Sequence, residues 1–152
     1  MPEFGTYGIN FPLTESRLGY MFDLTDTPEE EIKADLIHLL LTRKGMRFFL
    51  PDFGTRLYEY IFEPMDTLTF DSIEAEIREQ VDKYIPNLRI DNIKVEPISE
   101  AEESEGTLVT TNDDRVYRIS GAGTDEYTAK VRIDFSTTNT AFETKDFIII
   151  NL

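Results

Sequence analysis

The stretch FDSIEAEIREQVDKYIPNLRIDNIKVEPI, residues 70–98, contains the change of pattern that decides the fold. Its first half repeats apolar side chains at three- and four-residue spacing, which predicts an amphipathic helix over residues 70–84. Pro86 ends that helix because proline cannot continue the backbone hydrogen-bond ladder. The second half, residues 88–98, predicts a strand that is interrupted or bulged near Asp91 and Asn92. The chain therefore changes from helices to strands near Pro86.

A second helix is marked upstream, in the stretch TPEEEIKADLIHLLLTRKG, residues 27–45. Thr27 is the expected N-cap, with Pro28 at the first helical position and Glu30 completing a capping box. Gly45 is expected to end the helix in the left-handed conformation. The spacing predicts a buried stripe made of Ile32, Leu36, Leu39 and Leu40, which Leu41 widens.

The segments that flank this helix are expected to be less regular. Residues 1–26 are interpreted as an extended arm with a short strand near residues 9–13. After Gly45 the chain is expected to be extended through residue 49, and PDFG is expected to form a turn in which Gly54 adopts positive φ. A short helix over residues 57–62 should then stop at Pro64.

The C-terminal half carries strand signals. Residues 107–120 predict a hairpin with NDD at its turn, and residues 126–136 alternate apolar and polar side chains as a half-buried strand does. The last stretch, DFIIINL, is almost entirely apolar and is expected at a sheet edge or under a partner. This order predicts an α+β fold, with an N-terminal arm and two to three helices packed on one face of a mainly antiparallel sheet.

Composition limits the possible partners. The 152 residues include 30 acidic and 15 basic side chains, which give a net charge of −15, and no cysteine. Such a chain repels phosphate groups, so neither nucleic acid nor an acidic membrane surface is an expected partner. The absence of cysteine suits a reducing cytoplasm. No apolar run approaches the ~20 residues of a membrane span, and the N-terminus lacks the pattern of a secretory signal.

The sequence contains no recognisable catalytic or metal-binding pattern. His38 is the only histidine, no GxSxG motif is present, and the acidic runs lack the spacing of a calcium loop. GAG at residues 121–123 lacks the further glycine of a phosphate loop. We therefore predict no catalytic residue, metal or cofactor. A pair of carboxylates acting as a glycoside hydrolase stays open as an alternative, because the chain is rich in acids.

Basic and aromatic side chains are concentrated in residues 40–64 of this acidic chain. Arg43 and Lys44 are expected at the negative end of the first helix, and Arg47 and Arg56 follow closely. A buried guanidinium requires a partner, and carboxylates on this chain or on another protein could both provide one. The residues alone leave both possibilities open. The neighbouring aromatic residues are Phe48, Phe49, Phe53, Tyr58, Tyr60 and Phe62.

Several motifs follow one another in this region: LLTRKG, the arginine after it, PxFG, a leucine, an LFE-like IFE and the amphipathic helix. They are residues 40–45, Arg47, Pro51, Phe53, Gly54, Leu57 and residues 61–63. With these motifs in this order, residues 31–95 resemble the baseplate wedge and sheath-initiator family of contractile phage tails, which has a related component in the type VI secretion baseplate. Two positions depart from the family. Met46 replaces a common glutamate, and IPN at residues 85–87 replaces EPR, with an arginine only at Arg89.

This resemblance implies a structural, non-enzymatic baseplate wedge protein that nucleates the sheath. Its implied partners are other wedge proteins, the tail sheath protein and the tail tube, with six copies in a virion tail baseplate assembled in the host cytoplasm. It also implies one domain over residues 27–152, with an inserted hairpin near residues 99–126. A stand-alone regulatory domain of the same fold is the other alternative.

The resemblance and the residues together define two candidate binding sites. The wedge-binding residues are Arg43, Lys44, Arg47, Pro51, Phe53, Gly54, Arg56, Pro86 and Arg89. The sheath-binding residues, on a strand edge, are Phe147, Ile148, Ile149, Ile150 and Leu152.

Overall fold

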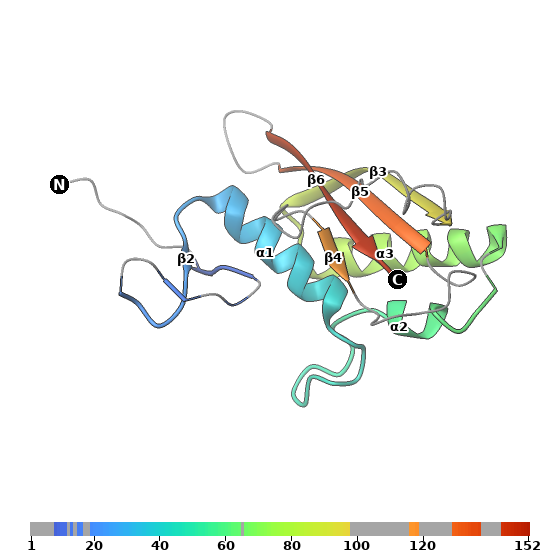
Figure 1. The fold of residues 1–152 in the computed structure, drawn as a ribbon, viewed down its shortest axis with the longest axis horizontal. Helices are drawn as coiled ribbons and strands as arrows, with labels where there is room; N and C mark the ends of the chain where they lie inside the picture. The colour runs from blue at the N-terminus through green and yellow to red at the C-terminus, as the bar shows by residue number, and fades with distance from the viewer. Residues whose placement is uncertain are drawn as a thin grey trace, which may run out of the picture.

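The computed structural model describes residues 8–11, 13, 15–16, 19–64, 66–97, 116–118, 129–137 and 144–152. Its element order is that of an α+β protein, as predicted (Figure 1). The helices are α1 (Pro28–Leu41), α2 (Leu57–Tyr60) and α3 (Thr67–Tyr84). The strands are β1 (Gly8–Ile9), β2 (Leu24–Thr25), β3 (Leu88–Pro97), β4 (Val116–Arg118), β5 (Ala129–Thr137) and β6 (Thr144–Asn151). Every described helix is too short or too polar for a membrane span.

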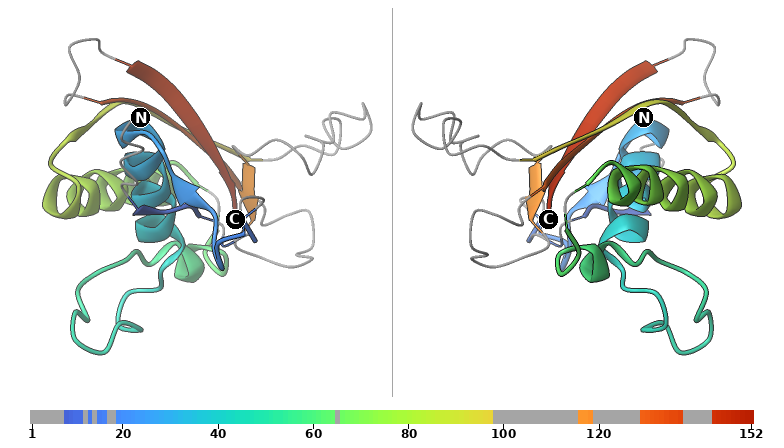
Figure 2. Two further views of the ribbon diagram at one scale, coloured as in Figure 1. Left: turned by 90° about the vertical axis from the view of Figure 1, so that its left-hand side faces the viewer. Right: turned by 90° about the vertical axis from the view of Figure 1, so that its right-hand side faces the viewer.

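The main sheet has four strands in the order β3-β5-β6-β4. β5 is antiparallel to both β3 and β6, and the pairing of β3 with β5 shifts between Ile90 and Asn92. This shift confirms the predicted bulge. Figure 2 shows α1 and α3 on the same side of the sheet. The predicted two-layer arrangement is therefore confirmed.

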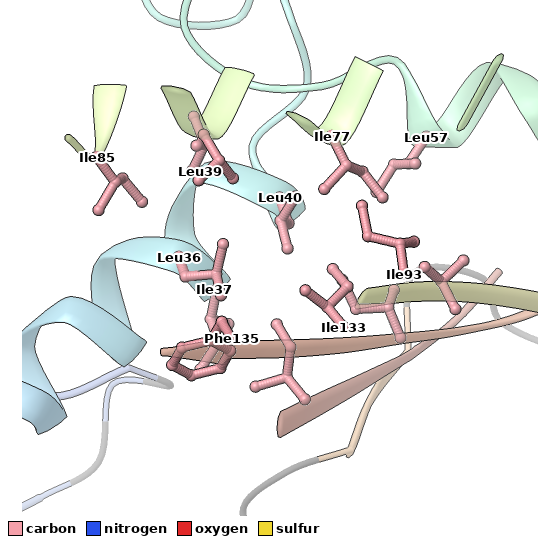
Figure 3. Packing of buried hydrophobic residues seen from close by; sticks show 14 of the residues in the cluster. Leu36, Ile37, Leu39, Leu40, Leu57, Ile77, Ile85, Ile93, Ile133 and Phe135 are labelled. Carbon is pink, nitrogen blue, oxygen red and sulfur yellow. The ribbon is translucent and has the colours of Figure 1, made fainter. Parts of the chain in front are cut away.

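The core fills the space between the helices and the sheet (Figure 3). Alternate residues of β5 point into it, as the predicted period of two requires: Ala129, Val131, Ile133 and Phe135 are all buried. From α1 the core takes Ile32, Leu36, Leu39 and Leu40, as predicted, together with Ile37. From α3 it takes Ile73, Ile77 and Val81, and from β6 it takes Ile148 and Ile150.

Local caps place the helix starts. The Thr27 side chain accepts a hydrogen bond from the Glu30 backbone N–H at 3.3 Å, which confirms the predicted N-cap of α1. α3 begins earlier than predicted, at Thr67, because Asp66 caps it and accepts from the Thr69 N–H at 2.9 Å. α2 is shorter than predicted and ends at Tyr60.

The predicted end of α1 is wrong. The helix stops at Leu41, and Thr42 is already extended, with φ −79° and ψ 124°. An isolated parallel bridge joins Arg43 to Thr55, and the Thr55 N–H donates to the Thr42 carbonyl at 2.9 Å. This pairing with a segment 13 residues away replaces the last helical turn. Gly45 does have positive φ, at 88°, but it lies in the following loop.

The two ends of the chain differ from expectation in separate ways. β1 covers only the start of the strand expected near residues 9–13, and it pairs antiparallel with β2 beside α1.

The expected hairpin over residues 107–120 lies mostly outside the described residues. Its described part, β4, pairs in parallel with residues Ile149 to Asn151 of β6. The edge position expected for the last strand is therefore wrong there, because β6 has neighbours on both sides.

Candidate partner-binding site

Residues 42–55 form a loop that leaves the body of the protein between α1 and α2 (Figure 1). We call this segment the 42–55 loop. Backbone hydrogen bonds close its base: the Lys44 N–H donates to the Thr55 carbonyl at 3.0 Å, and the Gly45 N–H donates to the Pro51 carbonyl at 2.8 Å. The Thr55 hydroxyl also donates to the Leu40 carbonyl at 2.8 Å. The stem of the loop is therefore held in one arrangement.

The prediction that the chain is extended after Gly45 through residue 49 is wrong. The Met46 N–H donates to the Arg43 carbonyl, and the Leu50 N–H donates to the Arg47 carbonyl, each at 3.1 Å. These short-range bonds fold the tip into successive turns. The tip must reverse direction because its two sides are joined through Gly45 and Pro51.

Gly54 allows the stem to close. Its φ is 103°, as the PDFG turn predicts, and a Cβ atom built there would lie 2.3 Å from the Thr42 carbonyl oxygen. No side chain fits at that distance, so the close approach of the two sides requires glycine.

Two buried polar residues of α3, Glu76 and Gln80, bind the base of the loop, and neither was among the predicted site residues. Glu76 Oε1 accepts from the Arg56 backbone N–H at 2.8 Å. With its amide oriented to donate, Gln80 lies 3.2 Å from the Asp52 carbonyl oxygen and 3.1 Å from that of Gly54. Both side chains occupy the buried face of the helix, next to Ile77 and Val81. A polar residue within an apolar stripe is the signal that could have identified them.

The arginines of the segment divide into two groups. Arg56 is exposed but paired within the chain: its Nε lies 3.3 Å from Glu76 Oε1, and the charge of Glu76 raises the pKa of Arg56. Arg43 lies over the Tyr58 ring at 5.5 Å, and Arg47 lies over the Phe53 ring at 4.4 Å. Within the described part of the chain, neither Arg43 nor Arg47 has a carboxylate within 4.0 Å. These two guanidiniums can face a partner.

A row of aromatic rings connects the stem to the body. Phe53 is buried and contacts His38 and Tyr84, with ring centroids 5.6 and 5.1 Å away. His38 in turn stacks on Phe11 at 5.8 Å. His38 therefore has a packing role among aromatic rings, and Phe53 belongs to the core rather than to an accessible surface.

The tip of the loop is apolar and faces solvent. We call Met46, Phe48, Phe49 and Leu50 the apolar tip. Phe48 and Phe49 are 90% and 93% exposed, and their rings meet edge to face at 5.2 Å. Met46 is 73% exposed and Leu50 is 41% exposed. Pro51, one of the predicted wedge-binding residues, is exposed beside them.

Pro86 and Arg89 lie beyond the C-terminal end of α3, apart from the apolar tip in the sequence. Both line a surface pocket of about 330 Å³ that Arg78, Asp82, Leu88 and Ile90 complete. Arg89 Nε lies 3.3 Å from Asp91 Oδ1, so this arginine has a partner within the chain.

The residues predicted to bind the sheath have two different environments. Ile148, Ile150 and Leu152 are buried in the core, and the Leu152 N–H donates to the Ala129 carbonyl at 2.8 Å. Phe147 and Ile149 are partly buried, and the Arg132 guanidinium lies 4.3 Å from the centre of the Phe147 ring. Any contact by this strand would therefore use its backbone or these two side chains.

The described residues contain no cluster of three or more His, Cys, Asp or Glu side chains suited to a metal ion. Oε1 of the buried Glu76 carboxylate accepts from Arg56, and Glu76 does not line the pocket that contains Asp82. Glycoside hydrolysis needs two carboxylates that face each other across a substrate.

Burial raises the pKa of Tyr60, and the charge of Glu76 raises it further, so this phenol stays neutral.

Three comparisons place the chain among known proteins. A protein of enterobacteria phage T4, baseplate wedge protein gp25, is 43% identical over 67 residues, which are 44% of this chain and 49% of the T4 protein. The chain thus spans about half the length of this relative.

Two solved structures share the fold. A Geobacter sulfurreducens protein, provisionally assigned as a tail lysozyme, superposes with a TM-score of 0.56 at 21% identity, over 83% of this chain and 92% of that one. A chain of the anti-feeding prophage baseplate superposes with a TM-score of 0.55 at 14% identity, over 96% of this chain and 84% of that one.

The family comparison covers more than half of the chain. The family described as baseplate wedge protein gp25 matches residues 26–113. This range begins just before α1 and includes the 42–55 loop, α3 and β3. The chain belongs to the gp25 family of baseplate wedge proteins.

Proposed function

We propose that this protein is a structural, non-enzymatic component of the baseplate of a contractile tail or related injection system. In this role it binds other wedge proteins and provides the surface on which the first sheath subunits assemble. The observation that carries the proposal is the family match over residues 26–113, which includes the 42–55 loop and the helix that holds it. The T4 relative is itself named a baseplate wedge protein, and the second structural neighbour comes from a baseplate.

The wedge-binding surface that we propose is narrower than the set of residues expected from the sequence. Arg43, Lys44, Arg47 and Pro51 lie on the loop, where Arg43, Arg47 and Pro51 are exposed. Phe53 and Gly54 are buried and support the loop through ring packing and close backbone approach, and the exposed Arg56 is paired with Glu76. Pro86 and Arg89 form a separate contact at the end of α3.

We propose that the sheath contact uses the backbone of β6. Among the described residues, β4 pairs with β6 only at residues 149–151, so the preceding part of β6 has β5 as its one described neighbour. An added strand could pair there, next to Phe147 and Ile148, with backbone hydrogen bonds giving affinity. The buried side chains of Ile148, Ile150 and Leu152 would stay in the core.

Six copies per baseplate, contact with the tail tube, and assembly in the host cytoplasm belong to the same proposal. The anti-feeding prophage baseplate was determined with six-fold symmetry, which supports a six-fold arrangement for a wedge protein of this fold. No nucleic acid or membrane partner is proposed, since the net charge is −15.

The test is co-expression of the chain with the baseplate and sheath proteins encoded beside it, followed by size-exclusion chromatography and electron microscopy. We expect the wild type to enter a wedge complex and Arg47→Glu to weaken its entry at least about 10-fold, since the new charge opposes the partner's carboxylates. Lys94→Glu is the control, because it makes the same charge change at an exposed cation of β3, outside both proposed surfaces. Failure of the wild type to join any wedge or sheath protein would refute the proposed function.

A further inference from the structure

The apolar tip has an exposure that folding does not explain. Two adjacent phenylalanines are more than nine-tenths exposed, with Met46 and Leu50 beside them. Contiguous exposed apolar groups of this kind mark interaction sites on soluble proteins. The tip lies at the far end of a loop that projects from both layers (Figure 2). It is therefore a protrusion, and its complement must be a recess on another molecule.

The stem presents the tip in a defined position. The backbone bonds between Gly45 and Pro51 and between Lys44 and Thr55 join the two sides of the loop. Gln80 of α3 binds the carbonyl groups of Asp52 and Gly54, and Glu76 binds the backbone N–H of Arg56 directly after the loop. The edge-to-face contact between Phe48 and Phe49 orders the two rings relative to each other. A preorganised anchor loses little conformational freedom on binding, so more of its burial is available as affinity.

The charge of the loop indicates the chemistry of the recess. Residues 42–55 carry three basic side chains, Arg43, Lys44 and Arg47, and one acid, Asp52, within a chain of net charge −15. The guanidiniums of Arg43 and Arg47 lie on aromatic rings and have no carboxylate within 4.0 Å in the part of the chain that the structure describes. An apolar pocket with carboxylates at its rim would bury the rings and pair both arginines.

We infer that the apolar tip is an anchor that inserts into an apolar, acid-rimmed pocket on a neighbouring wedge protein. The inference rests on the proposed function for the identity of the neighbour. The net charge of the whole chain disfavours a second copy and an anionic membrane, and the test below includes both as outcomes. Two copies of a chain with net charge −15 repel each other, and an anionic membrane repels the chain as a whole.

The test measures binding of the full chain to the wedge complex that it enters, by calorimetry at two salt concentrations. Phe48→Ser/Phe49→Ser should weaken binding at least about 30-fold, as loss of a central aromatic anchor does. Phe62→Ser is the matched control, because Phe62 is 84% exposed but lies beyond α2, and it should change affinity less than about 3-fold. Higher salt should weaken the wild type, because it screens the contact between the arginines and the rim.

The outcomes separate the inference from the proposed function. If the double variant binds as tightly as the wild type, the inference is overturned while the proposed function stands. If the wild type binds no wedge protein, the proposed function and this inference both fail. A photo-crosslinking residue at Phe49 then identifies the occupant. A crosslink to a second copy, or binding to anionic phosphatidylserine vesicles that the double variant abolishes, would replace the proposed partner.

Discussion

At the scale of single residues, Gly54 is the one described glycine that combines a positive φ with a close backbone contact. It combines a φ of 103° with a carbonyl oxygen only 2.3 Å from the position of a Cβ atom. Residues other than glycine are disfavoured in the left-handed conformation. The close backbone contact would raise the free energy of the folded state further for any residue with a side chain. The stem of the 42–55 loop therefore depends on this one glycine.

We expect Gly54→Ala to lower the free energy of unfolding by about 3 kcal/mol, the sum of left-handed strain and displacement of the stem. Urea denaturation measures the loss. Gly45→Ala is the control, because Gly45 has φ 88° but nothing within 4 Å of its Cβ position. It should cost only about 1 kcal/mol. Equal losses in the two variants would show that the approach to Thr42 is unimportant.

At the scale of elements, the helices depend on local caps. Asp66 begins α3 by accepting from the Thr69 N–H, and this hydrogen bond holds the pKa of Asp66 below its usual value. A carboxylate with a lowered pKa stabilises the folded state at neutral pH. The contribution is complete above the unfolded pKa of about 3.9 and disappears as pH falls through the lower, folded value.

Asp66→Asn should therefore flatten the dependence of stability on pH. Asparagine caps a helix as well as aspartate does, but it does not titrate. We expect the melting temperature of the wild type to fall more steeply than that of Asp66→Asn on acidification below about pH 4. All other carboxylates are shared and cancel in the comparison. Parallel curves for the two proteins would contradict the role assigned to this cap.

At the scale of the whole molecule, β6 lies within the sheet and contributes side chains to the core between the sheet and the helices. β5 and β4 flank it, and Ile148 and Ile150 point into the core that the helices cover. A terminal strand in this position is part of the fold rather than a detachable arm. The sheath contact that we propose would therefore add a strand next to β6 instead of removing β6 from its own sheet.

We expect Ile150→Asp to prevent folding, because an unpaired buried carboxylate costs several kcal/mol out of a total stability of about 5–15 kcal/mol. Ile149→Asp should fold, because its side chain lies on the other face and is only partly buried. Circular dichroism and size-exclusion chromatography of the two variants test this difference. A folded Ile150→Asp protein would mean that the end of the strand can leave the core.

Features that depend on neighbouring residues could be predicted from the amino-acid sequence. Thr27 and Pro28 begin α1, the spacing of Ile73, Ile77 and Val81 defines the buried face of α3, and alternation along β5 defines its inner side. Gly54 adopts the positive φ that PDFG predicts. Caps, periodicity and turn conformations arise from interactions over a few residues, so they can be predicted from the local sequence.

Contacts between groups that are far apart in the sequence became clear from the folded structure. It ended α1 at Leu41 through the pairing of Thr42 with Thr55, and it placed β4 beside β6. It also paired Arg56 with Glu76, 20 residues away, while Arg47 lies on a ring. Arginines of one segment thus make different contacts. Their partners depend on how α3 packs under the 42–55 loop, and no local pattern encodes that contact.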